Sequence, residues 1–296
     1  MKNPNIIKVG KYTVQFTNQD KIFFPDDKIT KGDIIQYYDQ IAPYMLKYTK
    51  NRALTMLRYP HGITQEGFYH KDAPDYFPDW IKRFVDINGE DKKVHYVVAN
   101  NAATLVYLAN FGCLIPHLWL SKIDKPNYPD RMIFDLDPSD DKSFKRIMET
   151  AKAFKKIIEE HNLVPFVMST GSRGLHVVVP IKRTKTFDEV KKFAQYLAQK
   201  LIEKDPEHLT MEIRKNKRGT RIFIDTLRNG YGATAVAPYA VRAKPGAPVA
   251  FPLEWNELNA KLTPTKYNIF TIFKRLDKVG DIWKNIDKQA KAIPRY

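Results

Sequence analysis

The chain has 296 residues, of which 43% are hydrophobic and 28% charged, so it can bury a core, and wholesale disorder or a fibrous repeat is excluded. No apolar run approaches the roughly 18 residues of a membrane span, the first ten residues do not resemble a secretory signal, and the single Cys113 cannot close an internal disulfide. We therefore expect a cytoplasmic protein. Lys and Arg outnumber Asp and Glu by 49 to 33, and the resulting net charge of +16 favours a polyanion such as nucleic acid. A solvated, lysine-rich surface is the alternative.

The first 130 residues mix short strand-like runs with helices. Alternating patterns predict strands over 11–16 (KYTVQF) and 53–60 (ALTMLRYP). Helical spacing of apolar residues predicts helices over 34–46, behind a cap sequence at 30–33, and over 100–112, ended by Gly112. The polar segment INGEDKK (87–93) predicts an exposed hairpin loop.

From residue 131 the predicted elements follow a recognisable order. They are a strand (131–138), a helix (143–161), two strands (164–169 and 175–181) around a Gly-rich turn, a helix (187–204), and strands over 221–225 and 235–243. Strand, helix, two strands, helix, strand is the order of a ferredoxin-like or RNA-recognition-type unit. Many unrelated functions use that order, so the fold alone assigns no activity.

Acidic residues mark two of these strands. Side chains alternate along Ile133-Phe134-Asp135-Leu136-Asp137-Pro138, which places Asp135 and Asp137 on one face. Asp225 ends the strand over 221–225, and the first and last strands of this order can lie close together. Neighbouring carboxylates repel unless cations lie between them, and Mg²⁺ and Mn²⁺ prefer oxygen ligands. The three aspartates predict a two-metal site of the kind that supports phosphoryl transfer; acids at a solvent-exposed strand end are the alternative.

The turn between the two central strands carries groups suited to phosphate. Its glycines let the backbone turn tightly, while Thr170, Ser172 and Arg173 offer hydrogen-bond donors to phosphate oxygens. His176 opens the next strand. The alternative is an ordinary hairpin with a surface or core histidine.

Taken together, these motifs resemble the archaeo-eukaryotic primase superfamily, specifically the polymerase domain of bacterial ligase D and its stand-alone relatives in non-homologous end joining. The similar segments cover nearly the whole chain: TNQDKIFFPDDKITKGDIIQYY, RALTMLRYPHGITQEGFYHK, FDLDP, STGSRGLHVVVP, RIFIDTLRNGYGATAVAPYAVRAKPGAPVA and WNEL (255–258). The resemblance implies an α/β (α+β) fold, a primase-type catalytic core with two small sheets flanked by helices and an RNA-recognition-like C-terminal half. We expect one domain over 1–296, with an N-terminal subdomain (1–130) and a catalytic subdomain (131–296).

The resemblance also implies site residues. Asp135 and Asp137 would be shared ligands of two divalent ions, Mn²⁺ or Mg²⁺, and Asp225 a ligand of the catalytic ion. The residues around an incoming NTP or dNTP would be His117, Thr170, Ser172, Arg173, His176, Arg218, Arg228 and Arg242. In the family the position of His117 lies near the sugar and triphosphate, consistent with a preference for ribonucleotides, which requires a contact to the 2′-hydroxyl.

A second set of implied residues concerns DNA. Asn18, Lys21 and Lys31 match a family pocket for the 5′-phosphate of the downstream strand, and the alternative for them is solvated lysines beside a helix. Phe68 and Tyr69 match an aromatic pair that stacks on the template. The segment 87–93 corresponds to a loop that helps to appose two broken ends.

The expected function is therefore a template-dependent nucleotidyltransferase that fills short gaps and extends ends during double-strand break repair. Its expected partners are DNA with gaps, overhangs or 5′-phosphorylated ends, a Ku homologue and a separate ligase, because the sequence has no Lys-x-Asp-Gly nucleotidylation motif. We expect cytoplasmic localisation at the nucleoid and no membrane partner. A primase that starts chains de novo, a non-catalytic end-bridging module and a two-metal phosphodiesterase are the alternatives.

Overall fold

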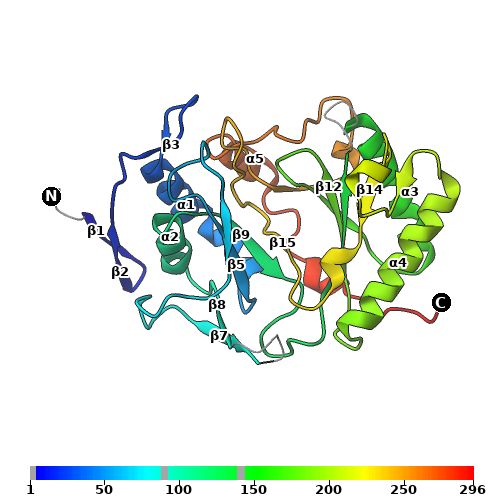
Figure 1. Ribbon diagram of the computed structural model, residues 1–296, viewed down its shortest axis with the longest axis horizontal. Coiled ribbons are helices and arrows are strands. Elements are labelled where there is room, and N and C mark those ends of the chain that lie inside the picture. Colours follow the sequence, from blue (N-terminus) through cyan, green and yellow to red (C-terminus); the bar gives the residue numbers. More distant parts are fainter. Residues whose placement is uncertain (1–4, 88–92, 139–143) are drawn as a thin grey trace. The chain divides into compact units, whose positions relative to one another are not determined.

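The computed structural model describes residues 5–87, 93–138 and 144–296 (Figure 1). The chain divides into two compact units, whose segments interleave along the sequence. Unit 1 comprises 1–119, 236–250 and 267–278, and unit 2 comprises 120–235, 251–266 and 279–296. The prediction placed two consecutive subdomains with a boundary at residue 130. The division differs because the chain returns twice to unit 1 after leaving it, a long-range property that local composition does not reveal.

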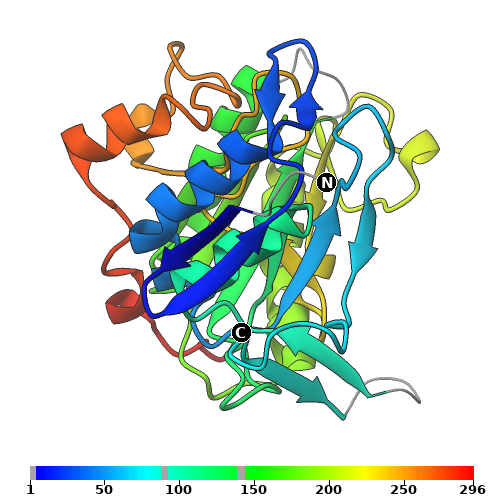
Figure 2. The ribbon, with the colours of Figure 1, turned by 90° about the vertical axis from the view of Figure 1, so that its left-hand side faces the viewer.

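Unit 1 is built around a mixed set of short strands. Its main sheet has the order β9 (Cys113–Trp119), β5 (Leu54–Arg58), β8 (Val94–Val97) and β7 (Arg83–Asp86), and β6 (Phe68–His70) also pairs with β5. Of β15 (Thr234–Val236), only Val236 belongs to unit 1. Two small hairpins precede the main sheet, β1 (Asn5–Val9) with β2 (Tyr12–Phe16), and β3 (Ile22–Phe24) with β4 (Ile29–Thr30). The helices are α1 (Lys31–Thr49), α2 (Ala102–Asn110) and α5 (Ile272–Val279). In Figure 2 the β1–β2 hairpin lies across α1 and α2.

Helix α1 begins where the sequence predicts a cap. The Thr30 hydroxyl accepts a hydrogen bond from the Asp33 backbone N–H, and the Asp33 carboxylate accepts one from the Thr30 backbone N–H, which forms a capping box. On the buried face, the Tyr37 hydroxyl donates to the Tyr239 carbonyl at 2.6 Å and the Tyr38 hydroxyl donates to the Leu114 carbonyl at 2.7 Å. These bonds satisfy two buried hydroxyls and fix the helix to distant parts of the chain.

Unit 2 contains the predicted ferredoxin-like arrangement. Its sheet has the order β13 (Leu209–Thr210), β14 (Ile222–Asp225), β10 (Arg131–Asp137), β12 (Leu175–Pro180), β11 (Phe166–Ser169) and β16 (Phe251–Leu253). Helices α3 (Phe144–Glu160) and α4 (Phe187–Lys204) lie side by side against one face of this sheet (Figure 1). Short 3-10 turns are η1 (Lys215–Lys217), η2 (Leu227–Asn229), η3 (Trp255–Glu257) and η4 (Ile286–Gln289).

Packing on this face follows the sequence pattern. Phe134 of β10 is fully buried, and its ring packs edge-on against Phe154 of α3 with 4.4 Å between ring centroids. Leu136 is equally buried, so the apolar side chains of β10 face the helices while the alternating aspartates face the other way. The predicted strand, helix and turn assignments from 131 to 225 are confirmed to within a few residues.

One predicted strand is largely wrong. Within the segment 235–243, β15 (Thr234–Val236) covers only the start, and the one further pairing among the described residues is an isolated antiparallel bridge of Val241 with Val249. Pro238 has no N–H to donate to a neighbouring strand, and Tyr239 has a φ of +67°, which turns the chain out of the sheet. The predicted hairpin loop over 87–93 joins two antiparallel strands, β7 and β8, but residues 88–92 lie outside the described residues. Among the helices of the described ranges, none is long and apolar enough to cross a membrane.

Candidate active site and phosphate pocket

The three predicted aspartates converge on two adjacent strands of unit 2. Strands β10 and β14 are antiparallel, and their register pairs Asp135 with Asp225. On its other side β10 pairs with β12, and there Asp135 faces His176. The Asp135 and Asp137 side chains are 19% and 33% exposed, whereas that of Asp225 is 13% exposed. The strand alternation seen in the sequence thus places three carboxylates on one face, partly withdrawn from water.

The carboxylates affect each other electrostatically. Burial raises the pKa of Asp137 above its usual value, and the charge of Asp135 raises it further. Burial also raises the pKa of Asp225, with a smaller upward contribution from Asp135 and a downward one from the Leu227 backbone N–H that donates to it at 2.7 Å. Because these carboxylates repel one another, a positively charged ligand bound between them would be stabilised.

Two arginines partly neutralise the carboxylates. Arg228 spans the pair on adjacent strands, with Nη2 at 3.7 Å from Asp135 Oδ2 and Nε at 3.4 Å from Asp225 Oδ2. Arg173 of the Gly-rich turn has Nη2 at 3.3 Å from Asp137 Oδ1. Both arginine side chains are about two-fifths exposed, so each can also reach a ligand from solvent. The turn and the strands therefore form one charged cluster, as the sequence predicts.

The position of Arg228 depends on a residue that the sequence analysis missed. Asn229 is fully buried, and its side-chain oxygen accepts from the Ile133 backbone N–H while its amide donates to the Ile133 carbonyl at 2.7 Å and the Thr226 carbonyl at 3.0 Å. These bonds fasten η2 to β10 and so hold Arg228 beside the carboxylates. No pattern in the sequence marks this asparagine, since its role depends on a contact across 96 positions.

The donor set fits hard divalent cations. Three carboxylates offer up to six oxygens, and two of the three have pKa values raised partly by a neighbouring carboxylate. Within the described ranges, no group of three or more His, Cys, Asp or Glu side chains is arranged to hold a metal as it stands. The ion pairs with Arg173 and Arg228 direct the carboxylates to guanidinium groups instead. A metal would therefore have to take over oxygens that these arginines now contact.

The Gly-rich turn is closed by Thr170. Its hydroxyl donates to the Gly174 carbonyl at 3.1 Å and accepts from the Gly174 backbone N–H at 3.3 Å. Gly174 packs directly against β10, because a Cβ at this position would collide with the Leu136 carbonyl oxygen. Ser172 and Arg173, between them, are half-buried at the tip of the turn. This close approach brings the predicted donors next to Asp137.

His176 is the buried end of the same cluster. Its Nε2 lies 3.5 Å from Asp135 Oδ1, and its Nδ1 is buried with no hydrogen-bond partner among the described residues. A buried nitrogen without a partner costs stability, so a histidine in this state is consistent with a group that acquires a partner when a ligand binds.

Arg218 contacts its own loop rather than the carboxylates. Its guanidinium donates to the carbonyls of Glu212 and Ile213, each at 2.8 Å, and lies 3.6 Å from the centre of the Phe223 ring. Its charge nevertheless lowers the pKa of Asp137, as does that of Lys215 on the same loop. Lys215 was not predicted, although the basic run at 214–218 is visible in the sequence.

The remaining predicted nucleotide residues, His117 and Arg242, belong to unit 1. His117 of β9 is buried, and the ring of Tyr69 packs edge-on against it with 5.5 Å between centroids. Arg242 is half-buried, and its charge lowers the pKa of Tyr59 and opposes the burial that raises it. Phe68 lies under the guanidinium of Arg58, 5.2 Å from its centre. Phe68 and Tyr69 are 46% and 58% exposed, and as strand neighbours they point to opposite faces of β6.

The predicted 5′-phosphate residues also come together in unit 1. Lys21 Nζ donates to the Pro60 carbonyl at 2.7 Å and lies 3.1 Å from Nδ1 of His61. Lys31 Nζ donates to the Thr17 carbonyl at 2.6 Å, and Lys31 is largely buried. The Lys31 pKa falls from 10.5 to about 8, first because of burial and then because of the charge of Lys21. The two ammonium groups therefore lie close enough to repel each other.

Backbone geometry brings these lysines into one place. Asn18 has a φ of +51°, a left-handed conformation that asparagine tolerates, and its carbonyl accepts from the Lys21 backbone N–H at 3.1 Å. The Lys31 backbone N–H donates to the Lys21 carbonyl at 2.7 Å, which ties the start of α1 to this turn. His61 is an additional neighbour of Lys21 that the sequence analysis did not identify.

Comparison with known proteins agrees with this geometry. The family model described as LigD, primase-polymerase domain, matches residues 30–283. The bifunctional non-homologous end joining protein LigD of Bacillus subtilis (strain 168) is 32% identical over 286 residues, which are 95% of this chain and 46% of that protein. The multifunctional LigD of Mycolicibacterium smegmatis is 28% identical over 94% of this chain and 36% of that protein. The chain spans less than half the length of these two curated relatives.

A solved structure is similar over nearly its full length. The polymerase domain from Mycobacterium tuberculosis ligase D, in complex with DNA, matches with a TM-score of 0.85 and 27% sequence identity. The match covers 94% of this chain and 99% of that domain. The chain therefore shares the fold of a ligase D polymerase domain. The chain belongs to the LigD primase-polymerase domain family, and the predicted family and fold class are confirmed.

Proposed function

We propose that this protein is a template-dependent nucleotidyltransferase that fills short gaps and extends ends at DNA double-strand breaks. The observation that carries the proposal is the pairing of Asp135 with Asp225 on adjacent strands, beside His176 and the phosphate-suited turn that carries Arg173. Membership of the LigD primase-polymerase family supports the same activity. The net charge of +16 suits a nucleic-acid substrate.

The reaction joins a primer 3′-oxygen to the α-phosphorus of an incoming nucleotide and breaks the bond to pyrophosphate. Two divalent ions, Mn²⁺ or Mg²⁺, held by Asp135, Asp137 and Asp225, would supply positive charge to the attacking and leaving oxygens. The protein's own groups orient the triphosphate. Arg173 and Arg228 present planar guanidinium forks from two sides of the cluster, and such forks bind phosphate oxygens bidentately.

The remaining groups hold the rest of the nucleotide. The buried Nδ1 of His176 and the hydroxyls of Thr170 and Ser172 are suited to phosphate oxygens at the inner end of the site. When phosphates attract Arg173 and Arg228, these side chains release carboxylate oxygens. The released carboxylates repel one another and therefore attract cations more strongly. Bound cations in turn attract the negatively charged triphosphate, so nucleotide binding and cation binding are expected to strengthen each other.

The substrate DNA would carry a 5′-phosphate near the primer end. A terminal phosphate carries more negative charge than a phosphodiester, so the close ammonium groups of Lys21 and Lys31, with Asn18 beside them, favour it. Phe68 and Tyr69 are exposed aromatic rings on which template bases can stack. The solved relative from M. tuberculosis is in complex with DNA, which supports DNA as the substrate.

A preference for ribonucleotides is the finer part of the proposal. It rests on His117, whose ring lies against Tyr69 and whose family counterpart is near the sugar. Distinguishing ribose from deoxyribose requires a hydrogen bond to the 2′-hydroxyl, which a histidine nitrogen can make. A Ku homologue and a separate ligase activity are further proposed partners, because the similar curated proteins are named for non-homologous end joining. Those proteins are about twice as long as this chain or longer, so the rest of the end-joining reaction is assigned to other protein segments. The bacterial nucleoid is the proposed location.

Primer extension on a gapped duplex tests the function directly. The gap is offered with a 5′-phosphate or a 5′-hydroxyl, with ribo- or deoxynucleotides, and with Mn²⁺ or Mg²⁺. We expect metal-dependent extension that is faster with ribonucleotides and with the 5′-phosphate. Asp137→Asn is the inactive control, and Asp277→Asn, an exposed change on α5, is the matched active control. Extension by wild type and Asp137→Asn at equal rates would refute the catalytic assignment, and no extension under any condition would favour an end-bridging role.

A further inference from the structure

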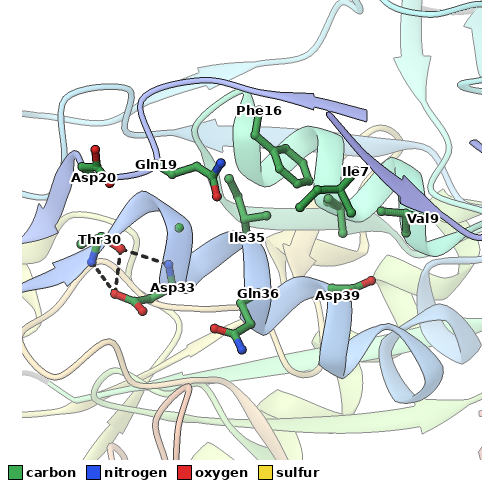
Figure 3. Close-up of a pocket in the computed structure, with 12 residues that line it drawn as sticks. Ile7, Val9, Phe16, Gln19, Asp20, Thr30, Asp33, Ile35, Gln36 and Asp39 are labelled. Carbon is green, nitrogen blue, oxygen red and sulfur yellow. Dashed lines mark hydrogen bonds between the residues drawn. The ribbon is translucent and has the colours of Figure 1, made fainter. Parts of the chain in front are cut away.

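Unit 1 contains a hollow of about 440 Å³ that no part of the proposed reaction uses (Figure 3). It lies between the β1–β2 hairpin and helices α1 and α2. The residues that line it are Ile7, Val9, Phe16, Gln19, Asp20, Thr30, Gly32, Asp33, Ile35, Gln36, Asp39 and Val106.

The lining of the hollow is apolar and acidic. Ile7, Val9, Phe16, Ile35 and Val106 form its apolar part, and Figure 3 shows the ring of Phe16 beside the side chain of Ile7. Three of the twelve lining residues are aspartates, and none is Lys, Arg or His, although the chain as a whole carries +16. The lining side chains themselves therefore offer phosphate groups no cationic partner, unlike the neighbouring Lys21 and Lys31.

One aspartate is available to a partner. The Asp33 carboxylate is engaged in the cap of α1, where it accepts from Thr30. Asp39, two turns further along the helix, is exposed and makes no hydrogen bond or ion pair with another described residue. Gln36, one turn before Asp39 on the same face, is also exposed. The rim thus offers a free anion beside an apolar floor.

The strand next to the hollow has an open edge. β1 pairs with β2 through all five of its residues, and no other described strand joins this two-stranded sheet. The outer edge of β2 is covered, since Asn110 of α2 accepts from the Thr17 backbone N–H and donates to the Gln15 carbonyl. No such cover lies on β1 among the described residues, and Ile7 is 47% exposed. Proteins usually protect an edge of this kind, because it can pair with another chain.

We propose that the hollow docks an extended segment of a partner protein that alternates apolar residues with lysine or arginine. The segment would pair with the free edge of β1 and place its apolar side chains on the floor beside Ile7 and Val9. A basic side chain of the segment would meet Asp39. The acidic rim selects a basic protein segment over nucleic acid, and the free strand edge selects an extended conformation over a helix. This surface shares no residue with the aspartate cluster or with the lysine pocket, although four lining residues, Gln19, Asp20, Thr30 and Gly32, are chain neighbours of Asn18, Lys21 and Lys31.

A pair of synthetic peptides tests the proposal with the full chain. One peptide is a fluorescein-labelled seven-residue sequence that alternates Lys with Val, and the other replaces each Lys with Glu. We expect the basic peptide to raise fluorescence anisotropy on titration, the acidic one to give no binding, and added salt to weaken the complex. Hydrogen exchange should show that the basic peptide protects amides of β1.

Charge reversal identifies the binding surface. Asp39→Lys should weaken binding of the basic peptide at least about fivefold, since an attraction becomes a repulsion. Asp277→Lys makes the same change on an exposed face of α5 and should leave the affinity unchanged within about twofold. Ile7→Ser tests the apolar floor without altering charge and should weaken binding by a similar factor. A far-UV spectrum and melting temperature for each variant separate loss of binding from loss of folding.

Several results would overturn the proposal. They are equal binding of both peptides, no binding up to millimolar concentration, equal effects of Asp39→Lys and Asp277→Lys, and protection on peptide binding that excludes β1. If gapped DNA displaces the basic peptide, and still does so in the Lys21→Ala variant, the hollow would be assigned to DNA. A wild-type dimer in sedimentation that Asp39→Lys dissociates would make a second copy of the chain the occupant.

Discussion

The aspartate cluster of unit 2 and the lysine pocket of unit 1 both concentrate like charges, but they do so by different means. The aspartates come from regular strands, whose register brings Asp135 opposite Asp225, and two arginines offset their repulsion. The lysines come from an irregular segment, and backbone carbonyls such as those of Pro60 and Thr17 hold their ammonium groups. In both places the pKa shifts toward the neutral form, upward for Asp137 and downward for Lys31. A charged ligand is therefore expected to restore full ionisation in each site.

Among the substitutions that distinguish the aspartate cluster from the lysine pocket, removal of a carboxylate should have the largest effect, and that effect should be on the rate of extension. Asp135→Asn, Asp137→Asn or Asp225→Asn should slow single-turnover extension about a thousandfold, because several kcal/mol of cation-dependent stabilisation are lost. Binding of gapped DNA should change little, since the lysine pocket is intact. Nucleotide incorporation near the wild-type rate in any of the three would remove that residue from the site.

The turn beside β10 should be the next most sensitive feature. Gly174→Ala places a Cβ against the Leu136 carbonyl, so the backbone must shift, and we expect a loss of about 1–3 kcal/mol of stability with reduced nucleotide binding. The matched control is Gly230→Ala, where the nearest atom to a new Cβ, the Leu227 oxygen, lies at an ordinary 3.4 Å. Thermal melting of both variants measures the difference. Equal melting temperatures would show that the turn can move away from β10.

Removing the charges of the lysine pocket should reduce the preference for 5′-phosphorylated DNA and leave the nucleotidyl-transfer reaction itself intact. Lys21→Ala combined with Lys31→Ala should reduce the preference for 5′-phosphorylated over 5′-hydroxyl gapped DNA about tenfold or more, because two charge-assisted hydrogen bonds are lost. The control is Lys274→Ala with Lys278→Ala, which removes the same charge from an exposed part of α5. Equilibrium binding at low salt gives the ratio of dissociation constants. A wild-type protein that shows no preference would remove both lysines from a 5′-phosphate site.

The smallest expected effect is a pH dependence of that preference. The pKa of Lys31 in the free protein is about 8, so its ammonium group is largely charged at pH 7 and largely neutral at pH 9. The preference for a 5′-phosphate should therefore fall about severalfold over this interval, and phosphate binding near pH 8 should take up a proton. Lys31→Arg should keep the preference constant, since arginine stays charged. Proton uptake is measured by calorimetry in buffers of different ionisation enthalpy, and its absence near pH 8 would contradict the assigned role.

The sequence predicts the regular parts of the molecule better than the contacts that adjust them. Alternation in 133–138 and the acid at the end of 221–225 suffice to predict β10, β14 and their shared carboxylate face. The roles of Asn229 and Gly174 depend on atoms in β10 that are distant in sequence, so no local pattern reveals them. Arg218 is another example. The family resemblance implies that this arginine lies near the nucleotide, whereas in the structure its guanidinium donates hydrogen bonds to the carbonyls of Glu212 and Ile213. Around Tyr239 the local pattern itself is misleading: the apolar run predicts a strand, but the left-handed backbone of Tyr239 ends the extended segment.

The interleaving of the two units has a consequence for how the chain is made on the ribosome. The hydroxyl of Tyr37 bonds a carbonyl 202 positions later, so the interior of unit 1 lacks a partner until residue 239 has been synthesised. The ferredoxin-like strands of unit 2 are complete earlier, at Asp225, apart from the edge strand β16. We therefore expect unit 2 to fold first during translation, although most of unit 1 is made before it. The half-finished N-terminal region would expose apolar surface in the meantime and would depend on chaperones while the rest of the protein emerges.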